Sequence, residues 1–124
     1  MNLNLLLLIV GSILLSSFAQ IVLKAGMSNT YVLAAIQSAD PFSIIKTIAT
    51  NAFVIGGLCL YFSSALVWLL VLAKVDVSFA YPFVGIGFIL TMLLAFFING
   101  EPLSTTKIIG TLCIALGVAI ISQG

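Results

Sequence analysis

The chain has 124 residues, of which 63% are apolar and only 6% are charged, with no histidine and a formal net charge of +1. This composition lies far outside soluble usage, so it excludes a water-soluble globular protein and predicts one all-α membrane domain over residues 1–124. The small charge, without a basic patch, excludes a nucleic-acid partner.

The first apolar run covers residues 3–24 and is long enough to cross a bilayer core of roughly 30 Å. A secretory signal peptide is the competing interpretation. The first four residues carry no lysine or arginine, however, and the run exceeds an ordinary signal core. We therefore predict a retained helix.

This first helix carries a polar seam. Ser12, Ser16, Gln20 and Lys24 recur every four residues, so they lie on one helix face, and Ser17 widens it. Polar groups in hydrocarbon face a bundle interior or a wet cavity. The seam therefore either lines a cavity or supplies hydrogen bonds between helices, while Lys24 could also extend to the lipid headgroups.

Residues 25–50 form the longest and least apolar connection. Within it, Asp40 is expected to cap a short helix whose first residue is Pro41. Over residues 41–49 the apolar side chains share one face and Lys46 lies off it, which predicts an interfacial helix lying on the membrane. A plain loop is the alternative.

A second spanning helix is predicted at residues 51–73. Tyr61, Ser64 and Trp68 follow at spacings of three and four, so they share one face. Inside a membrane the tyrosine hydroxyl and the indole N–H need partners. Those partners are either neighbouring helices or a bound ligand.

The third spanning helix is predicted at residues 78–98, after a link so short that helices two and three must be antiparallel neighbours. Tyr81 and Pro82 stand near its start. Gly85 and Gly87 follow, and two glycines this close weaken a helix locally. The pair predicts a hinge.

The fourth spanning helix is predicted at residues 104–122, with Ser104 as its N-cap. Gly110 and Gly117 are seven residues apart and so fall on one face. A glycine groove lets another helix approach closely, which predicts a dimer interface. The alternative is that glycine is simply common in membrane helices.

Four spans place both termini on one side of the membrane. Lys74 lies on that side, and Lys24, Lys46 and Lys107 lie on the other. The positive-inside rule then favours a cytoplasmic position for residues 25–50. The excess of lysines on one side is small, so insertion of the chain in both orientations is the alternative.

Catalytic chemistry has no residues to carry it. No acid lies inside a predicted span, and the sequence has no metal-ligand cluster and no phosphate-cradling glycine loop. Cys59 and Cys113 lie in apolar runs and are read as small buried hydrophobic residues. We expect no enzyme, cofactor, metal site or pore.

Three stretches together carry a family resemblance: QIVLKAG (Gln20–Gly26), AYPFVGIG (Ala80–Gly87) and INGEPLSTTKIIGTLCIALGVAII (Ile98–Ile121). In order and spacing, over nearly the whole chain, they resemble the small multidrug resistance-like and EamA-like four-helix members of the drug/metabolite transporter superfamily. The resemblance implies that helices one to three line a chamber. It also implies that Gly110 and Gly117 join two protomers, commonly antiparallel, which expose the chamber to either side in turn.

The sequence departs from the drug exporters at one position. They carry a membrane-embedded glutamate two turns before the lysine that ends helix one, and the matching residue here is Ser16. Serine does not titrate in the range needed for exchanging protons against cations. The chain looks more like the branch without this glutamate, which includes the undecaprenyl-phosphate-aminoarabinose flippase subunit type.

This resemblance implies a transporter that moves a polyprenyl-phosphate-linked sugar, or a related lipid carrier, across the bacterial inner membrane. It would work by alternating access, as a homodimer or as a heterodimer with a similar small subunit. The residues expected to contact the substrate are Ser16, Gln20, Lys24, Tyr61, Trp68 and Tyr81. Lys24, with Lys46 or Lys107, would contact the phosphate.

Two alternatives remain open. The first is a small multidrug resistance-type exporter of small cations or metabolites, in which Trp68 and Tyr81 offer aromatic faces to a cation. The second is a non-transporting membrane partner that stabilises a larger complex.

Overall fold

A computed structural model describes residues 3–124, and within this range every regular element is a helix. In chain order these are α1 (Leu3–Met27), α2 (Thr30–Gln37), α3 (Pro41–Ala49), α4 (Ala52–Leu72), α5 (Val77–Ala80), the 3₁₀ turn η1 (Tyr81–Phe83), α6 (Val84–Asn99) and α7 (Thr105–Ile121). The all-α membrane class predicted from the sequence is thereby supported.

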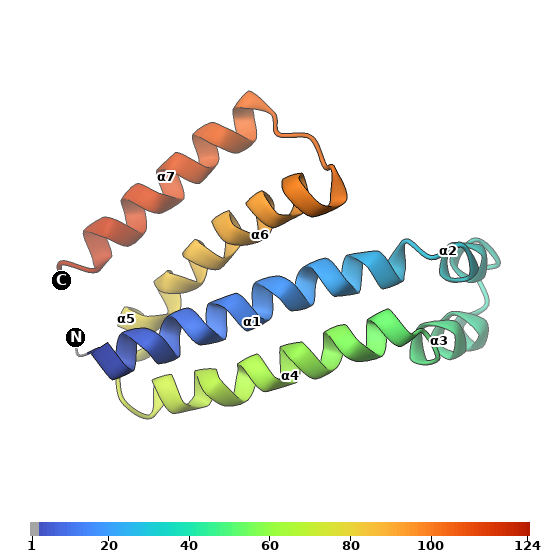
Figure 1. Cartoon of the computed structure of the whole chain (residues 1–124), viewed down its shortest axis with the longest axis horizontal. Coiled ribbons are helices and arrows are strands. Elements are labelled where there is room, and N and C mark those ends of the chain that lie inside the picture. Colours follow the sequence, from blue (N-terminus) through green and yellow to red (C-terminus); the bar gives the residue numbers. More distant parts are fainter. Residues whose placement is uncertain (1–2) are drawn as a thin grey trace.

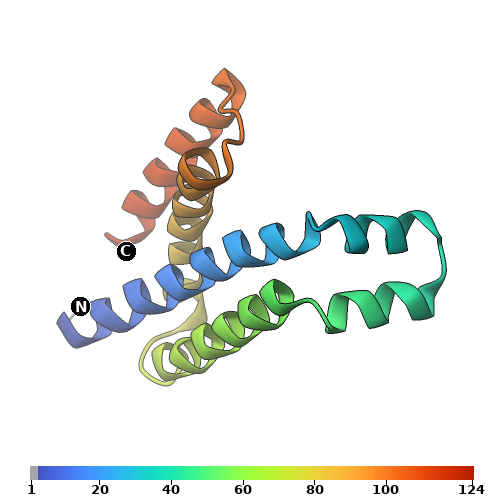
Figure 2. The same cartoon turned by 45° about the vertical axis from the view of Figure 1, so that its right-hand side comes forward.

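Two helix pairs make up the bundle. α1 and α4 run side by side and antiparallel, and α6 crosses against α1 and carries α7 on its other side (Figures 1 and 2). The start of α1 and the end of α7 lie at the same end of the bundle (Figure 1), as the prediction of four crossing helices requires. α1 is therefore the helix through which the α1–α4 pair contacts the α6–α7 pair.

Three segments are long and apolar enough to cross a membrane: Leu3–Met27, Ala52–Leu72 and Val77–Asn99. α7 has 17 residues, about 25 Å at 1.5 Å per residue, slightly less than a bilayer core. Large apolar side chains remain exposed on the outer faces; Phe62 is 65% exposed and Leu112 is 64% exposed. Such continuous apolar surface is typical of a membrane-facing protein.

The buried core lies toward the end of the bundle that holds the termini (Figure 1). It consists of Leu5, Ile9 and Ile13 of α1 together with Val71, Ala80, Phe83 and Val118. α1 thus contributes apolar residues to the core at this end and, beyond Ser12, turns a polar face between the helix pairs. This cluster joins the two pairs near the termini, and Ser17 of α1 contacts Gly87 of α6 beyond it.

Glycines provide the closest helix contacts. A Cβ atom at Gly57 would lie 2.7 Å from Leu23 Cγ, and one at Gly85 would lie 2.9 Å from Ile114 Cγ2. α1 and α4, and likewise α6 and α7, therefore approach more closely than a side chain at these positions would permit. A Cβ atom at Gly87 would lie 3.4 Å from Ile13 Cγ2 of α1.

The third spanning segment is irregular, but at a different place from the predicted hinge. The chain leaves the α-helix at η1, and Gly85 and Gly87 lie within α6 as packing contacts. Proline at residue 82 accounts for this position, because it cannot donate the backbone hydrogen bond that a continuous helix would need. Movement at Gly85 and Gly87 stays a prediction.

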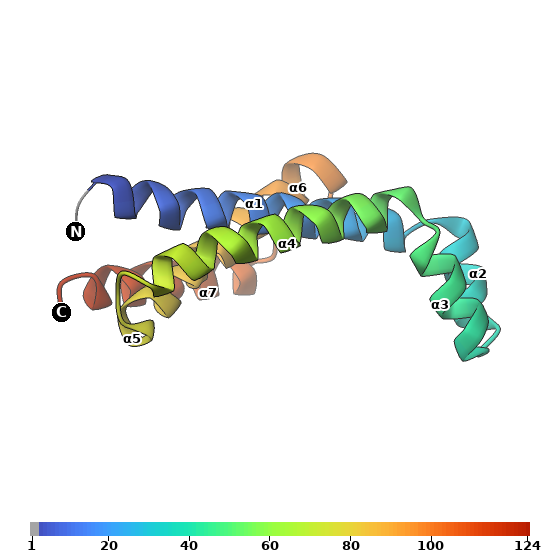
Figure 3. The ribbon, with the colours of Figure 1, turned by 90° about the horizontal axis from the view of Figure 1, so that it is seen from below.

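The connection over residues 25–50 contains more helix than predicted. The predicted helix at residues 41–49 is present as α3, and α2, which the sequence analysis missed, pairs with it. The two form an arm that bends away from the direction of α1 and α4 (Figure 3). Asn29 is the N-cap of α2, and its side chain accepts a hydrogen bond from the Tyr31 backbone N–H at 2.8 Å. A lone asparagine is a weaker sequence signal for a helix start than the Asp-Pro pair that precedes α3.

The N-cap positions of α3 and α7 are as predicted. Asp40 does occupy the N-cap position of α3, and Pro41 is its first residue, but the carboxylate accepts a hydrogen bond from Ser43 Oγ at 2.8 Å instead of from a backbone N–H. Ser104 caps α7 as predicted, accepting from the Lys107 N–H at 3.2 Å.

The two cysteines are free and exposed rather than buried. In a helix that is apolar on all sides, the sequence does not show which face packs against another helix. Cys59 and Cys113 lie on faces that no other helix of this chain covers. Gly110 and Gly117 share this property, since nothing lies within 4 Å of a Cβ at either position.

Candidate functional site

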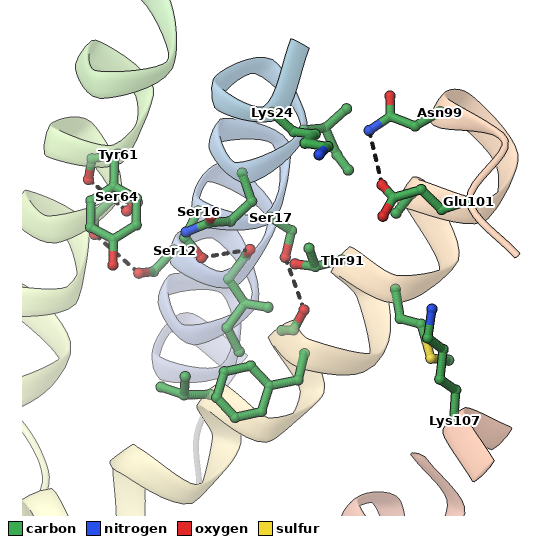
Figure 4. Close-up of a pocket in the computed structure, with 18 of the residues that line it drawn as sticks. Ser12, Ser16, Ser17, Lys24, Tyr61, Ser64, Thr91, Asn99, Glu101 and Lys107 are labelled. Atoms are coloured by element: carbon green, nitrogen blue, oxygen red, sulfur yellow. Dashed lines mark hydrogen bonds between the residues drawn. The ribbon is translucent and has the colours of Figure 1, made fainter. Parts of the chain in front are cut away.

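A cavity of about 760 Å³ opens between α1, α4, α6 and the loop that leads into α7 (Figure 4). It is lined by all six residues predicted to contact a substrate: Ser16, Gln20, Lys24, Tyr61, Trp68 and Tyr81. The tertiary structure thus brings together three helices that the sequence analysis treated one at a time. That these side chains bind a substrate stays a prediction.

The polar seam of α1 divides into two parts. Ser12 is buried and its Oγ donates to the Ser64 carbonyl oxygen of α4 at 3.0 Å. Ser17 is also buried and its Oγ donates to the Gly87 carbonyl oxygen of α6 at 3.4 Å. These two serines link α1 to both neighbouring helices, which confirms the interhelical interpretation for them.

The rest of the seam faces the cavity. Ser16 Oγ donates to the Ile13 carbonyl oxygen of its own helix at 3.0 Å, which leaves its lone pairs available. Gln20 and Lys24 are exposed, and neither side chain makes a hydrogen bond or an ion pair within residues 3–124. Ser12 and Ser17 also border the cavity, so the whole seam lines it and two of its serines link the helices as well.

The aromatic residues across the cavity also have uncommitted polar atoms. Tyr61 and Tyr81 are 46% and 63% exposed, and Trp68 is partly buried against the core. Within the described part of the chain, neither the two hydroxyls nor the indole N–H forms a hydrogen bond. An unpaired donor costs free energy in hydrocarbon, so this surface is suited to a polar ligand or to water.

The cavity end beside the loop between α6 and α7 holds Asn99, Glu101 and Lys107 (Figure 4). Asn99 Nδ2 donates to Glu101 Oε2 at 3.3 Å, and Lys107 Nζ donates to the Pro102 carbonyl oxygen at 3.0 Å. Lys24 reaches the same end from α1. Lys46 lies on α3 and is not among the lining residues, so of the two further lysines suggested for a phosphate only Lys107 is at the cavity.

Sequence reasoning missed the contribution of α6. Thr91 and Asn99 line the cavity, and with Gly87 and Ala95 they recur every four residues. This is the same periodicity that revealed the seam of α1, but with only two polar members. Glu101 lies outside the predicted spans, and the structure shows that it lines the cavity.

The cavity offers hydroxyl, amide and indole groups along its length and two lysines and one carboxylate at one end. This set can bind a ligand that is polar and charged, but it contains no nucleophile–base pair. Within residues 3–124 no group of three or more metal-binding side chains occurs. The fold and the site together define a small multi-pass membrane protein with a polar cavity open between its helices.

One relative aligns over nearly the whole chain. The chain is 35% identical over 117 residues to the probable 4-amino-4-deoxy-L-arabinose-phosphoundecaprenol flippase subunit ArnF of Proteus mirabilis, and this alignment covers 92% of the chain and 88% of that protein. The chain belongs to the family of these flippase subunits.

Further relatives match over a shorter stretch. The probable flippase subunit ArnE of Pseudomonas fluorescens is 41% identical over 61 residues, or 49% of this chain and 54% of that protein. ArnE of Pseudomonas aeruginosa is 40% identical over 58 residues, or 47% and 50%. The chain thus spans about half the length of the ArnE relatives it matches. No family model matches the chain, and no solved structure does so.

Proposed function

We propose that this chain is a flippase subunit that moves a polyprenyl-phosphate-linked sugar across the bacterial inner membrane. The relatives are named for 4-amino-4-deoxy-L-arabinose-phosphoundecaprenol, a lipid of this class. The observation that carries the proposal is the row of uncommitted polar side chains on three apolar helices, ending at a lysine. Such groups are costly inside a bilayer unless a polar ligand occupies the site.

The arrangement suits the two ends of such a lipid. Lys24 and Lys107 offer cations to the phosphate, and Gln20, Tyr61 and Trp68 offer donors to the sugar hydroxyls. From Ser12 to Lys24 the seam of α1 rises about 18 Å at 1.5 Å per residue, enough to hold a monosaccharide phosphate. The exposed apolar faces of the helices would hold the polyprenyl tail.

In this proposal α7 is the fourth span, and the chain works as a dimer with itself or with a similar small subunit. Alternating access would come from rocking of the two helix pairs about the core that they share near the termini. The assignment to the drug/metabolite transporter superfamily is part of the same proposal, as are the interfacial position of α3 and the hinge at Gly85 and Gly87.

Native mass spectrometry of the protein, extracted gently from its own membrane, tests the function. We expect a dimer that carries a polyprenyl-phosphate mass, because Lys24 and Lys107 would retain the anionic headgroup. A species without lipid that gains mass only after addition of an aromatic cation would contradict the proposal and favour the exporter. A protein recovered only in a complex with a larger chain would favour the non-transporting partner.

Gly110 and Gly117 supply a separate test of the dimer. Leucine at Gly117 is expected to weaken dimerisation in lipid by about tenfold, because it would prevent close helix approach. A Cβ at Gly117 meets nothing within 4 Å in the single chain, so folding should be unaffected. Gly56→Leu, at an equally open position of α4, is the control. Cross-linking yield against dilution in bilayers measures the effect, and equal yields for both variants would place the interface elsewhere.

A further inference from the structure

Glu101 is the one acidic side chain among the residues that line the cavity. Its position is set by the end of α6. Gly100 adopts the left-handed conformation with φ of 68°, and the backbone N–H groups of Gly100 and Glu101 both donate to the Ala95 carbonyl oxygen, the latter at 3.2 Å. This is the usual way in which a glycine ends a helix. The backbone of Glu101 is therefore held in place rather than free to move.

The carboxylate itself is oriented by a neighbour. Asn99 Nδ2 donates to Glu101 Oε2 at 3.3 Å, and Asn99 also lines the cavity (Figure 4). Glu101 forms no ion pair within residues 3–124, although Lys24 and Lys107 line the same cavity. Lys107 Nζ donates a hydrogen bond to the Pro102 carbonyl oxygen instead.

The site therefore presents separate charges of both signs to a ligand. The lysines suit an anion such as a phosphate, and the carboxylate suits a cation. A neutral sugar would leave the carboxylate without a counter-charge at the cavity surface, at a cost in desolvation. A headgroup that carries both a phosphate and a protonated amine would satisfy all three side chains.

We infer that Glu101 is the residue that selects for a primary amine on the sugar headgroup, and that Asn99 positions its carboxylate. This inference rests on the proposed function and deepens it: it assigns to one side chain the recognition of the amine in an amino sugar that is joined through phosphate to a polyprenol. The relatives named for a 4-amino sugar fit this class. Lys24 contacts the phosphate and Glu101 contacts the ammonium group.

Two lipids distinguish the amine from the rest of the headgroup. Binding of polyprenyl-phosphate-linked 4-amino-4-deoxy-arabinose is compared with binding of the same lipid carrying arabinose, whose 4-position holds a hydroxyl. The full chain is used in lipid nanodiscs. We expect the wild-type protein to bind the amino lipid about tenfold more tightly, since a hydrogen bond to a charged group at a partly exposed site is worth about that factor.

Glu101→Gln should abolish this preference, because glutamine keeps the acceptor for Asn99 and loses only the charge. Glu101→Asp should retain part of it. Asp76→Asn removes the same charge at the other end of the bundle and should keep the full preference. Asn99→Ala should reduce the preference by a smaller factor than Glu101→Gln.

Each outcome separates the two claims. A wild-type protein that binds both lipids equally overturns the amine assignment without any variant, and leaves the flippase proposal standing. Glu101→Gln protein that still prefers the amino lipid overturns it too. Wild-type protein that binds neither lipid overturns the proposed function itself.

Discussion

Replacing Lys24 by glutamine is expected to weaken binding of a polyprenyl-phosphate lipid by about 10- to 100-fold and to slow its translocation correspondingly. A hydrogen bond to a charged group contributes about 1.5–3 kcal/mol, and tenfold in affinity corresponds to about 1.4 kcal/mol. The Lys24 ammonium makes no hydrogen bond or ion pair within residues 3–124, so the variant loses no internal contact. The loss of affinity would therefore come from a lost contact with the lipid rather than from a change in the fold.

The matched control is Lys46→Gln. It removes the same charge from α3, outside the cavity, and is expected to leave lipid binding within about twofold. Lipid binding in nanodiscs and translocation of a labelled lipid in proteoliposomes measure both variants. Gln20→Ala is measured alongside, as a neighbouring residue of the same seam. If neither Lys24→Gln nor Gln20→Ala reduces translocation, the assignment of the substrate site to this face of α1 is wrong.

Alanine at Gly26 is expected to destabilise the pairing of α1 with α4 by about 1–3 kcal/mol, the usual cost of overpacking. Its Cβ would lie 2.7 Å from Val54 Cγ2 and 2.9 Å from the Val54 backbone nitrogen. A backbone atom cannot turn aside as a side chain can. The same methyl would stand 2.9 Å from Asn51 Oδ1, the atom that caps α4.

Asn51 explains why this one position has so large an effect. Its Oδ1 accepts from the N–H groups of Phe53 and Val54 at 3.0 and 3.1 Å, and its Nδ2 donates to the Gly26 carbonyl oxygen at 3.3 Å. One side chain thus begins α4 and fastens it to the end of α1. Displacing it would remove a helix cap worth about 1 kcal/mol as well as the interhelical bond.

Gly11→Ala, in the same helix, is the control. Nothing lies within 4 Å of a Cβ there, so stability should be unchanged or slightly higher because alanine favours helix. Unfolding in mixed detergent, followed by circular dichroism, gives the free energy difference between the two variants. Equal stability of Gly26→Ala and Gly11→Ala would contradict the close approach of α1 and α4.

Local sequence signals determined where the helices lie. The apolar runs at residues 3–24, 51–73 and 78–98 match helical segments of the structure, and the Asp-Pro signal located α3. Hydrophobicity and capping are properties of neighbouring residues, so they can be read without knowing the fold. The missed α2 and the misplaced irregularity at Tyr81–Phe83 are exceptions with weak or competing local signals.

The candidate site could be predicted in part. The four-residue recurrence on α1 pointed to Gln20 and Lys24, and the aromatic spacing on α4 pointed to Tyr61 and Trp68, because helical periodicity alone shows which side chains share a face. It could not show which faces meet. Asn99 and Glu101 join the cavity only because α6 crosses α1, and they carry too few polar neighbours for a pattern.

The sequence by itself determined an apolar helical chain with a polar face on its first helix, since composition and period are sufficient for both. Only the tertiary structure decided how that face is used. Ser12 and Ser17 donate to carbonyl oxygens of α4 and α6 and hold the helices together, while Gln20, which lines the same cavity, makes no hydrogen bond within residues 3–124. Residues a few positions apart on α1 contact different helices, because α4 and α6 pack against α1 from different directions. Those directions are set by long-range contacts, which a local sequence pattern does not contain.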